Sequence, residues 1–268
     1  MKKKISNKFN VTYLIFPFIL IIISILIYRY YYNIEKFKPI DDHHDIIFYS
    51  YGNEYKKFNK LIDSAIENNV NIKVNGIGVK WLDFSTKLEN FHNFIENVED
   101  NKIVMCIDAF DVLIFDNAEN MKNKFLEFNK PLVFSCEIHC GPDPDVAKHY
   151  PITDEKFKYL NAGTYMGYAW KIKEMLRHIK DTENYNCKTY HTNKQHNKAD
   201  DQRCLTKYYL NNMNDIALDY KQKIWSVTLG TGRQDYEIVK YSELFNKITN
   251  ERSSILHFNG WMEWYREF

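Results

Sequence analysis

From residue 45 onward, short apolar runs alternate with segments in which apolar side chains recur every three or four positions. The short runs are typical of buried strands, and the recurring positions are typical of helices with one buried face. The predicted strands cover residues 45–50, 71–75, 103–107, 131–135 and 159–168, and the predicted helices cover residues 55–69, 86–98, 118–128, 170–179 and 201–211. This alternation predicts an α/β fold with a largely parallel sheet, in which ligands bind beyond the carboxyl ends of the strands.

The N-terminus has a different pattern. Residues 11–28 carry no charged side chain, and lysines precede them at positions 2, 3, 4 and 8. A run of about 18 apolar residues is long enough to cross a bilayer, and basic residues favour its cytoplasmic side. A buried core helix fits Pro17 and the charged flanks less well. The pattern predicts a type II membrane protein of the endoplasmic reticulum or Golgi, with a cytoplasmic tail (1–10), an anchor (11–28), a juxtamembrane stem (29–44) and a lumenal domain (45–268).

Composition narrows the class of protein. The 268 residues are 45% hydrophobic, which allows one large domain with its own core, and the net charge of +1 gives no field that attracts nucleic acid. The five cysteines leave at least one thiol unpaired, with Cys136–Cys140 and Cys187–Cys204 as possible disulfides. A zinc site is not predicted, because CEIHC at 136–140 has no second cluster at finger-like spacing.

Two carboxylates, Asp108 and Asp111, interrupt the apolar run at 103–115. Burying an unpaired carboxylate is costly or raises its pKa, so a cation, a basic side chain or a wet cleft at the end of the strand is expected beside the pair. Two hard oxygen ligands at the end of a strand suit a divalent cation. Helix capping by Asp111 explains the pattern without a metal. A metal-dependent phosphohydrolase is disfavoured, because no nucleophile or basic phosphate clamp can be placed beside the pair.

Several segments occur in an order that carries more information than any one of them. They are IDAFDVL at 107–113, FSCE at 134–137, YP at 150–151, YLNAGTYMGYA at 159–169, DDQ at 200–202, KYY at 207–209 and HFNG at 257–260. Together they resemble the glycosyltransferase domain of the procollagen lysyl hydroxylase and glycosyltransferase family, from about residue 45 to residue 260. The resemblance implies a GT-A-like nucleotide-sugar transferase fold that uses a UDP-sugar and manganese, without the hydroxylase portion of the long members.

The resemblance assigns a metal site. It makes Asp108 and Asp111 manganese ligands and His257 a third ligand, a donor set that manganese accepts. Without the resemblance, the better explanation of His257 is a core or edge histidine whose hydrogen bonds are satisfied. Phe110 stands where the family has an aromatic residue, usually Tyr, that stacks on uracil.

The resemblance also assigns residues along the donor. Lys87 matches a lysine that contacts the donor phosphates, although a solvated lysine at a helix start is the simpler interpretation. Asn161, Gly163 and Gly260 belong to the donor site, where small residues let the backbone approach a sugar. The family commonly has Ser at position 162 and Gly at position 164, where this chain has Ala and Thr.

Two adjacent carboxylates, Asp200 and Asp201, match an acidic pair at the sugar end of the site. The resemblance makes them catalytic, either by orienting sugar hydroxyls or by taking the acceptor proton. Asp201 is also predicted to cap the helix at 201–211, after a polar loop at 181–200.

The sequence therefore predicts a membrane-anchored, manganese-dependent glycosyltransferase. It would move glucose or galactose from UDP to an acceptor such as hydroxylysine or galactosyl-hydroxylysine of a collagen-like protein. The alternative is a non-catalytic glycan-binding or scaffold protein that retains the fold. Turnover of UDP-sugar separates the two.

Overall fold

The computed structural model describes residues 23–24, 46–187, 199–260 and 263–268. The chain divides into two compact units, residues 1–42 and 43–268, and the second carries the features discussed below. The predicted tail, stem and anchor lie outside the described residues, except for Ile23 and Ser24 of the anchor. Among the described residues, no helix is both long and apolar enough to span a bilayer.

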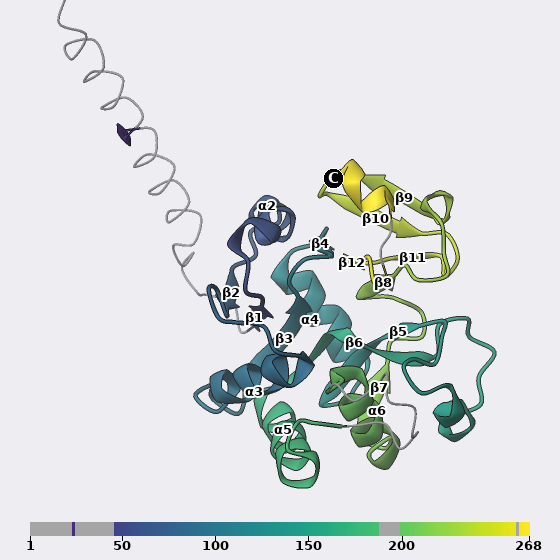
Figure 1. The fold of residues 1–268 in the computed structure, drawn as a ribbon. Helices are drawn as coiled ribbons and strands as arrows, with labels where there is room; N and C mark the ends of the chain where they lie inside the picture. Colours follow the sequence, from purple (N-terminus) through teal and green to yellow (C-terminus); the bar gives the residue numbers. More distant parts are fainter. Residues whose placement is uncertain (1–22, 25–45, 188–198, 261–262) are drawn as a thin grey trace, which may run out of the picture. The chain divides into compact units, whose positions relative to one another are not determined.

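A six-stranded mixed sheet forms the centre of the domain, with strand order β2-β1-β3-β6-β5-β7 (Figure 1). Its strands are β1 (Ile46–Tyr51), β2 (Ile72–Asn75), β3 (Ile103–Asp108), β5 (Leu132–Glu137), β6 (Tyr159–Tyr168) and β7 (Ile216–Leu218). The predicted α/β class is confirmed, but the prediction of a largely parallel sheet is wrong for β6, which runs antiparallel to both β3 and β5. A parallel return needs a crossover, and between β5 and β6 the structure has only the short 3-10 helix η2 (Pro144–His149).

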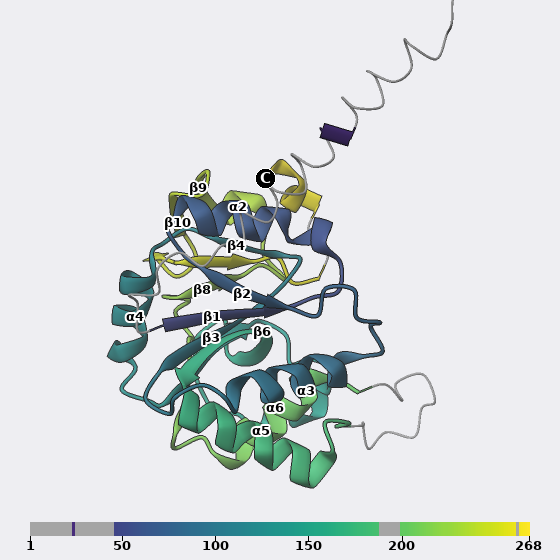
Figure 2. The same ribbon diagram turned by 90° about the vertical axis from the view of Figure 1, so that its left-hand side faces the viewer.

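Three helices cover one face of the sheet: α3 (Phe84–Ile95), α5 (Ala169–Glu183) and α6 (Asp201–Asn211) (Figure 2). Their apolar positions join the strands in the main core, for example Phe91 of α3, Leu176 of α5 and Leu205 of α6. The other helices are α2 (Asn59–Glu67), which follows the 3-10 helix η1 (Tyr55–Phe58), and α4 (Ala118–Glu127). The predicted helices are all present within a few residues, because each has a distinct apolar face.

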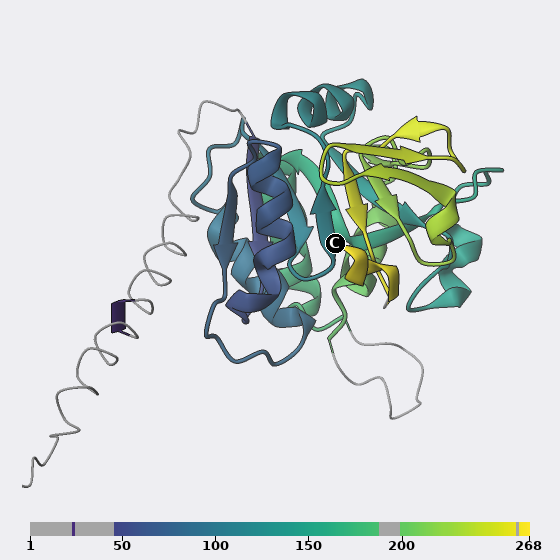
Figure 3. The ribbon, with the colours of Figure 1, turned by 90° about the horizontal axis from the view of Figure 1, so that it is seen from above.

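Two three-stranded sheets, formed mainly by the C-terminal part of the chain, gather at one side of the domain (Figures 1 and 3). One consists of β4 (Val112–Ile114), β12 (Ile255–His257) and β8 (Trp225–Val227). The other consists of β9 (Tyr236–Val239), β10 (Glu243–Asn246) and β11 (Glu251–Arg252). The short helices η4 (Arg233–Asp235) and η5 (Glu263–Glu267) complete this part. These short strands were not predicted, because runs of two to four residues carry little periodicity.

The region from the end of α5 to the start of α6 differs from the prediction in two ways. Helix α5 continues to Glu183, so the predicted loop begins later than residue 181. The residue that caps α6 is Asp200, whose side chain accepts a hydrogen bond from the backbone of Arg203, and the prediction that Asp201 caps the helix is wrong. Of the two possible disulfides, Cys187–Cys204 is formed, while Cys136 and Cys140 are free thiols.

Candidate functional site

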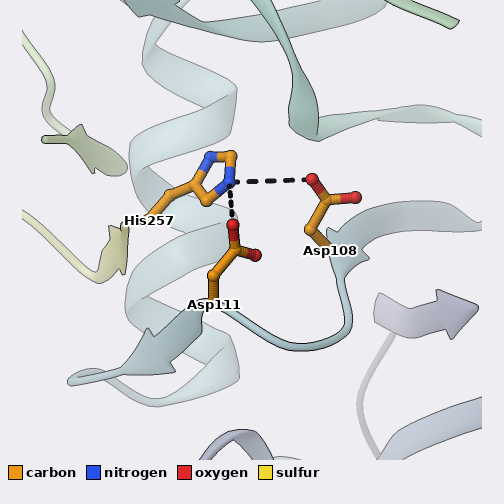
Figure 4. A group of neighbouring side chains, drawn as sticks. All are labelled: Asp108, Asp111 and His257. Atoms are coloured by element: carbon orange, nitrogen blue, oxygen red, sulfur yellow. Dashed lines mark ion pairs between the residues drawn. The ribbon is translucent and has the colours of Figure 1, made fainter. Parts of the chain in front are cut away.

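Asp108, Asp111 and His257 converge beyond the end of β3 (Figure 4). The Nε2 atom of His257 lies 3.6 Å from Oδ2 of Asp108 and 3.4 Å from Oδ2 of Asp111. Ligand atoms that share a divalent cation at roughly 2.1 Å are about 3 Å apart, so these separations are close to those of a shared ion. The structure brings the three predicted ligands together.

Strand pairing explains why residues so distant in sequence meet. Asp108 is the last residue of the central strand β3, and the chain then turns so that Asp111 directly precedes β4. Strand β12 runs antiparallel to β4, with His257 opposite Val112, and the backbone N–H of Phe258 donates to the carbonyl oxygen of Asp111 at 2.8 Å. The short sheet that the sequence did not predict therefore positions the histidine.

Gly163 lies against the same three-residue cluster, because β6 pairs with β3. A methyl group added at Gly163 would lie 2.2 Å from Cε1 of His257 and 2.6 Å from Oδ2 of Asp108. Real Cβ atoms do not approach other atoms so closely. Only glycine leaves room here for the imidazole and the carboxylate at their present positions.

The chemistry of the cluster fits a divalent metal ion. Two carboxylates and one imidazole are ligands that manganese accepts. Burial of the His257 ring disfavours its charged form, but Asp111 and Asp108 outweigh burial and raise its pKa, so the two carboxylates favour a positive charge at this position. The other ring nitrogen, Nδ1, is buried and has no hydrogen-bond partner among the described residues. Packing against Gly163 orients this side of the ring.

Lys87 connects the cluster to α6. Its buried ammonium donates to Oδ1 of Asp108 at 2.6 Å and to Oδ2 of Asp201 at 2.8 Å. Burial disfavours the charged form of Lys87, but the two carboxylates outweigh burial and raise its pKa well above the ordinary value. Lys87 is therefore a buried cation in contact with a candidate metal ligand, and the interpretation as a solvated lysine at a helix start is wrong.

The adjacent carboxylates of Asp200 and Asp201 face different partners. Asp201 is buried against Lys87, and Asp200 caps α6 by accepting from the backbone N–H of Arg203 at 2.9 Å. Burial raises the pKa of both carboxyl groups, and Lys87 opposes this effect at Asp201 without cancelling it. The structure thus places Asp201 beside the metal cluster through Lys87.

A second polar cluster, which the sequence did not single out, surrounds Glu137 at the end of β5. Its carboxylate accepts hydrogen bonds from Gln202 at 2.5 Å and from Asn259 at 2.8 Å, and burial raises its pKa. Gln202 also accepts from the backbone N–H of Ala162, and Asn161 accepts from that of Gly163. These residues lie in the FSCE, YLNAGTYMGYA, DDQ and HFNG segments, so the ordered motifs were the signal that could have identified this cluster.

Two predicted donor residues lie outside the metal cluster. Phe110 packs edge-on against Phe58, with ring centroids 5.4 Å apart, and its ring also lies against Gly52. Gly260 has a left-handed backbone, with φ of +78°, at the end of the described segment 199–260. A methyl group there would lie 3.0 Å from Leu229.

A mixed α/β domain with an Asp-Asp-His cluster at the end of its central strand is consistent with the GT-A-like class of glycosyltransferase domains. The chain belongs to the family of the PLOD GT domain, whose model matches residues 45–265.

The chain is similar to several curated proteins. An uncharacterized protein of Acanthamoeba polyphaga mimivirus is 30% identical over 62% of this chain and 33% of its own length. The multifunctional procollagen lysine hydroxylase and glycosyltransferase of Caenorhabditis elegans is 29% identical over 75% of this chain and 28% of its own length. The procollagen-lysine,2-oxoglutarate 5-dioxygenase 2 of Homo sapiens is 27% identical over 69% of this chain and 25% of its own length. The matches thus span a third of these relatives or less.

The packing at Gly163 predicts that Gly163→Ala weakens manganese binding. The added methyl group must displace His257 or Asp108, and disturbing the groups that orient metal ligands costs roughly 10–100-fold in affinity. Gly141→Ala is a matched control, because its methyl group would meet Gln202 at an ordinary 3.5 Å. Titration of both variants with Mn²⁺, followed by electron paramagnetic resonance, measures the difference. Unchanged affinity in Gly163→Ala would contradict the arrangement.

Proposed function

We propose that the domain is a metal-dependent glycosyltransferase that moves a hexose, glucose or galactose, from a UDP-sugar to an acceptor. The proposed acceptor is hydroxylysine or galactosyl-hydroxylysine of a collagen-like protein. Membership of the PLOD GT domain family supports transfer of a sugar. The acceptor is supported by the relatives from Caenorhabditis elegans and Homo sapiens, whose names refer to procollagen lysine.

One observation carries the proposal. The fold brings Asp108, Asp111 and His257 into one cluster and places the Lys87–Asp201 ion pair directly against it. A nucleoside diphosphate carries concentrated negative charge, so a site for it needs positive charge held in a fixed place. The three ligands would hold a divalent ion, and Lys87 supplies a second, permanent positive charge next to it.

The metal is proposed to be Mn²⁺, which would neutralise charge on the departing UDP. The chain's own residues prepare the site for that ion. Asp108 contributes one carboxylate oxygen to the His257 side and presents the other to Lys87, so the lysine fixes the orientation of this ligand. Gly163 fills the space behind the ligands without displacing them.

Asp201 is proposed as the residue that handles the acceptor proton or a sugar hydroxyl, with Asp200 beside it. A carboxylate is a better general base when its pKa is raised toward the working pH, and burial has this effect on both groups. The Lys87 ammonium holds one oxygen of Asp201 in place. The backbone of β6 at Asn161 and Gly163, close to both clusters, is proposed to face the sugar.

We also propose that the domain works in an oxidising compartment, as expected for a lumenal domain. The Cys187–Cys204 disulfide supports this location, since such bonds persist mainly in exported or lumenal proteins. Membrane attachment through residues 11–28 stays a prediction of the sequence.

A donor screen tests the proposed function. We expect purified protein to release UDP from UDP-glucose or UDP-galactose only when Mn²⁺ and a hydroxylysine or galactosyl-hydroxylysine acceptor are present. Asp111→Ala should lower turnover by at least ~100-fold, the scale of losing one principal electrostatic stabiliser. The exposed Asp154→Ala provides the control. Glycan binding without release of UDP from any donor would instead identify a non-catalytic binding protein.

The different contacts of Asp200 and Asp201 predict different mutant behaviour. Asp201→Asn should lower the rate of transfer steeply and leave UDP affinity nearly unchanged, because an interaction made in the transition state changes rate and not ground-state binding. Asp200→Ala should lose a helix cap worth about 1 kcal/mol, whereas Asp200→Asn keeps a capping oxygen. Thermal unfolding and single-turnover transfer separate the effects. Full activity in Asp200→Asn would leave Asp200 with a capping role alone.

A further inference from the structure

The first turn of α6 is held from several sides at once. Its four consecutive side chains, Asp201, Gln202, Arg203 and Cys204, bind respectively to α3, to the end of β5, to the loop before η2 and to the segment after α5. Because an α-helix has 3.6 residues per turn, consecutive side chains point in different directions, and one turn can be fixed from every side. The position of this turn determines where Asp201 lies.

Arg203 lies outside the metal cluster and holds the turn through its guanidinium. Its guanidinium is bidentate to Asp143, with Nε to Oδ2 at 2.6 Å and Nη2 to Oδ1 at 3.3 Å. Its Nη1 donates to the backbone carbonyl oxygen of Cys187 at 3.0 Å. The Arg203 side chain is only 6% exposed. A buried, planar fork of this kind constrains distance and orientation together.

The disulfide secures the same turn from the same segment. Cys204 is joined to Cys187, the residue whose carbonyl oxygen binds Arg203, and both sulfur-bearing residues are buried. Two independent links, one covalent and one through a single hydrogen bond, therefore connect the first turn of α6 to one residue after α5. This redundancy lies next to the proposed catalytic carboxylates, since Asp200 and Asp201 immediately precede Gln202.

We propose that Arg203 and the Cys187–Cys204 disulfide are positioning residues for sugar transfer. They hold the first turn of α6 so that Asp201 stays on Lys87, beside Asp108. The proposal rests on the proposed glycosyltransferase function, in which Asp201 acts at the sugar or acceptor. It assigns no contact with donor or acceptor to Arg203 or to either cysteine. Loosening the turn should therefore slow the transfer step and spare the metal site.

The first test replaces the guanidinium fork. Arg203→Gln should lower kcat for transfer by roughly tenfold or more, because a displacement of about 1 Å in a reacting group can cost up to ~100-fold. The KM for UDP-sugar and the affinity for Mn²⁺ should change less than about twofold. Arg203→Lys, which keeps the charge without the fork, should recover only part of the rate. Asp143→Asn should resemble Arg203→Gln, and combining the two should add little, as expected of partners in one interaction.

The second test opens the covalent link. Dithiothreitol, which supplies the two electrons and two protons needed to convert the disulfide into two thiols, should slow transfer by the oxidised wild-type protein. Cys187→Ser/Cys204→Ser should be slow from the start and insensitive to dithiothreitol. Cys140→Ser, which removes a half-buried free thiol and keeps the disulfide, should behave as the wild type does.

Hydrogen exchange gives a readout that needs no activity. The amides in the first turn of α6 should exchange faster in Arg203→Gln and in the reduced protein, while those of β3 stay protected. Absence of UDP release by the wild type would refute the proposed function, and unchanged α6 exchange would refute the positioning role separately. The positioning role would also be overturned if Arg203→Gln lost Mn²⁺ affinity and transfer rate equally. A wild-type rate in both Arg203→Gln and the reduced protein would overturn it as well.

Discussion

The structure depends on how positive charge is placed around Asp108, a carboxylate at the end of a buried strand. The buried partner is Lys87, and removing Asp108 would leave this ammonium without solvation or full compensation, which is costly. The fold supplies partners from two directions: Lys87 from α3 on one side and His257 from β12 on the other. A divalent ion in the Asp-Asp-His cluster would complete this compensation. Such partners explain why an apolar strand can end in acidic residues.

This constraint reaches through the C-terminal half of the chain. His257 meets Asp108 only because β12 pairs with β4, and the imidazole fits only because position 163 of the neighbouring strand β6 is glycine. Lys87 has two carboxylates to satisfy, and the second, Asp201, belongs to α6. The position of α6 is thereby coupled electrostatically to the metal cluster. Lys87 therefore defines where Asp201, at the start of this helix, lies relative to the metal cluster.

Local patterns in the sequence predicted those strands and helices that are determined by their own residues. The strands β1, β2, β3, β5 and β6 and all the main helices were predicted from periodicity. The need for a partner at the acidic residues near the end of β3 was predicted from the cost of burying charge. Adjacent residues are harder to separate, because Asp200 and Asp201 both satisfy the pattern of a helix cap and only the structure shows that Asp200 fills it. The two possible disulfides likewise satisfied the same cysteine count, and spatial proximity decides between them.

Contacts between residues far apart in sequence could not be predicted from local patterns. Some were predicted from the family resemblance, and the others were not predicted. His257 lies in a three-residue strand whose periodicity carries no signal, so its place among the ligands came from the resemblance. The direction of β6 depends on the route of the chain between β5 and β6. The Lys87–Asp201 pair joins residues 114 positions apart, and Glu137 was part of a recognised segment without an assigned partner. Each of these features is a property of packing between elements.

We infer that the Asp-Asp-His cluster holds a divalent ion through which UDP is bound. Calorimetric titration of the protein with UDP, first with Mn²⁺ and then after chelation of metal by EDTA, tests this claim most directly when His257→Ala is measured alongside. We expect UDP binding by the wild type to depend strongly on Mn²⁺, and we expect His257→Ala, with its fold intact by circular dichroism, to lose this dependence. Equal affinity for UDP with and without metal in the wild type would contradict it.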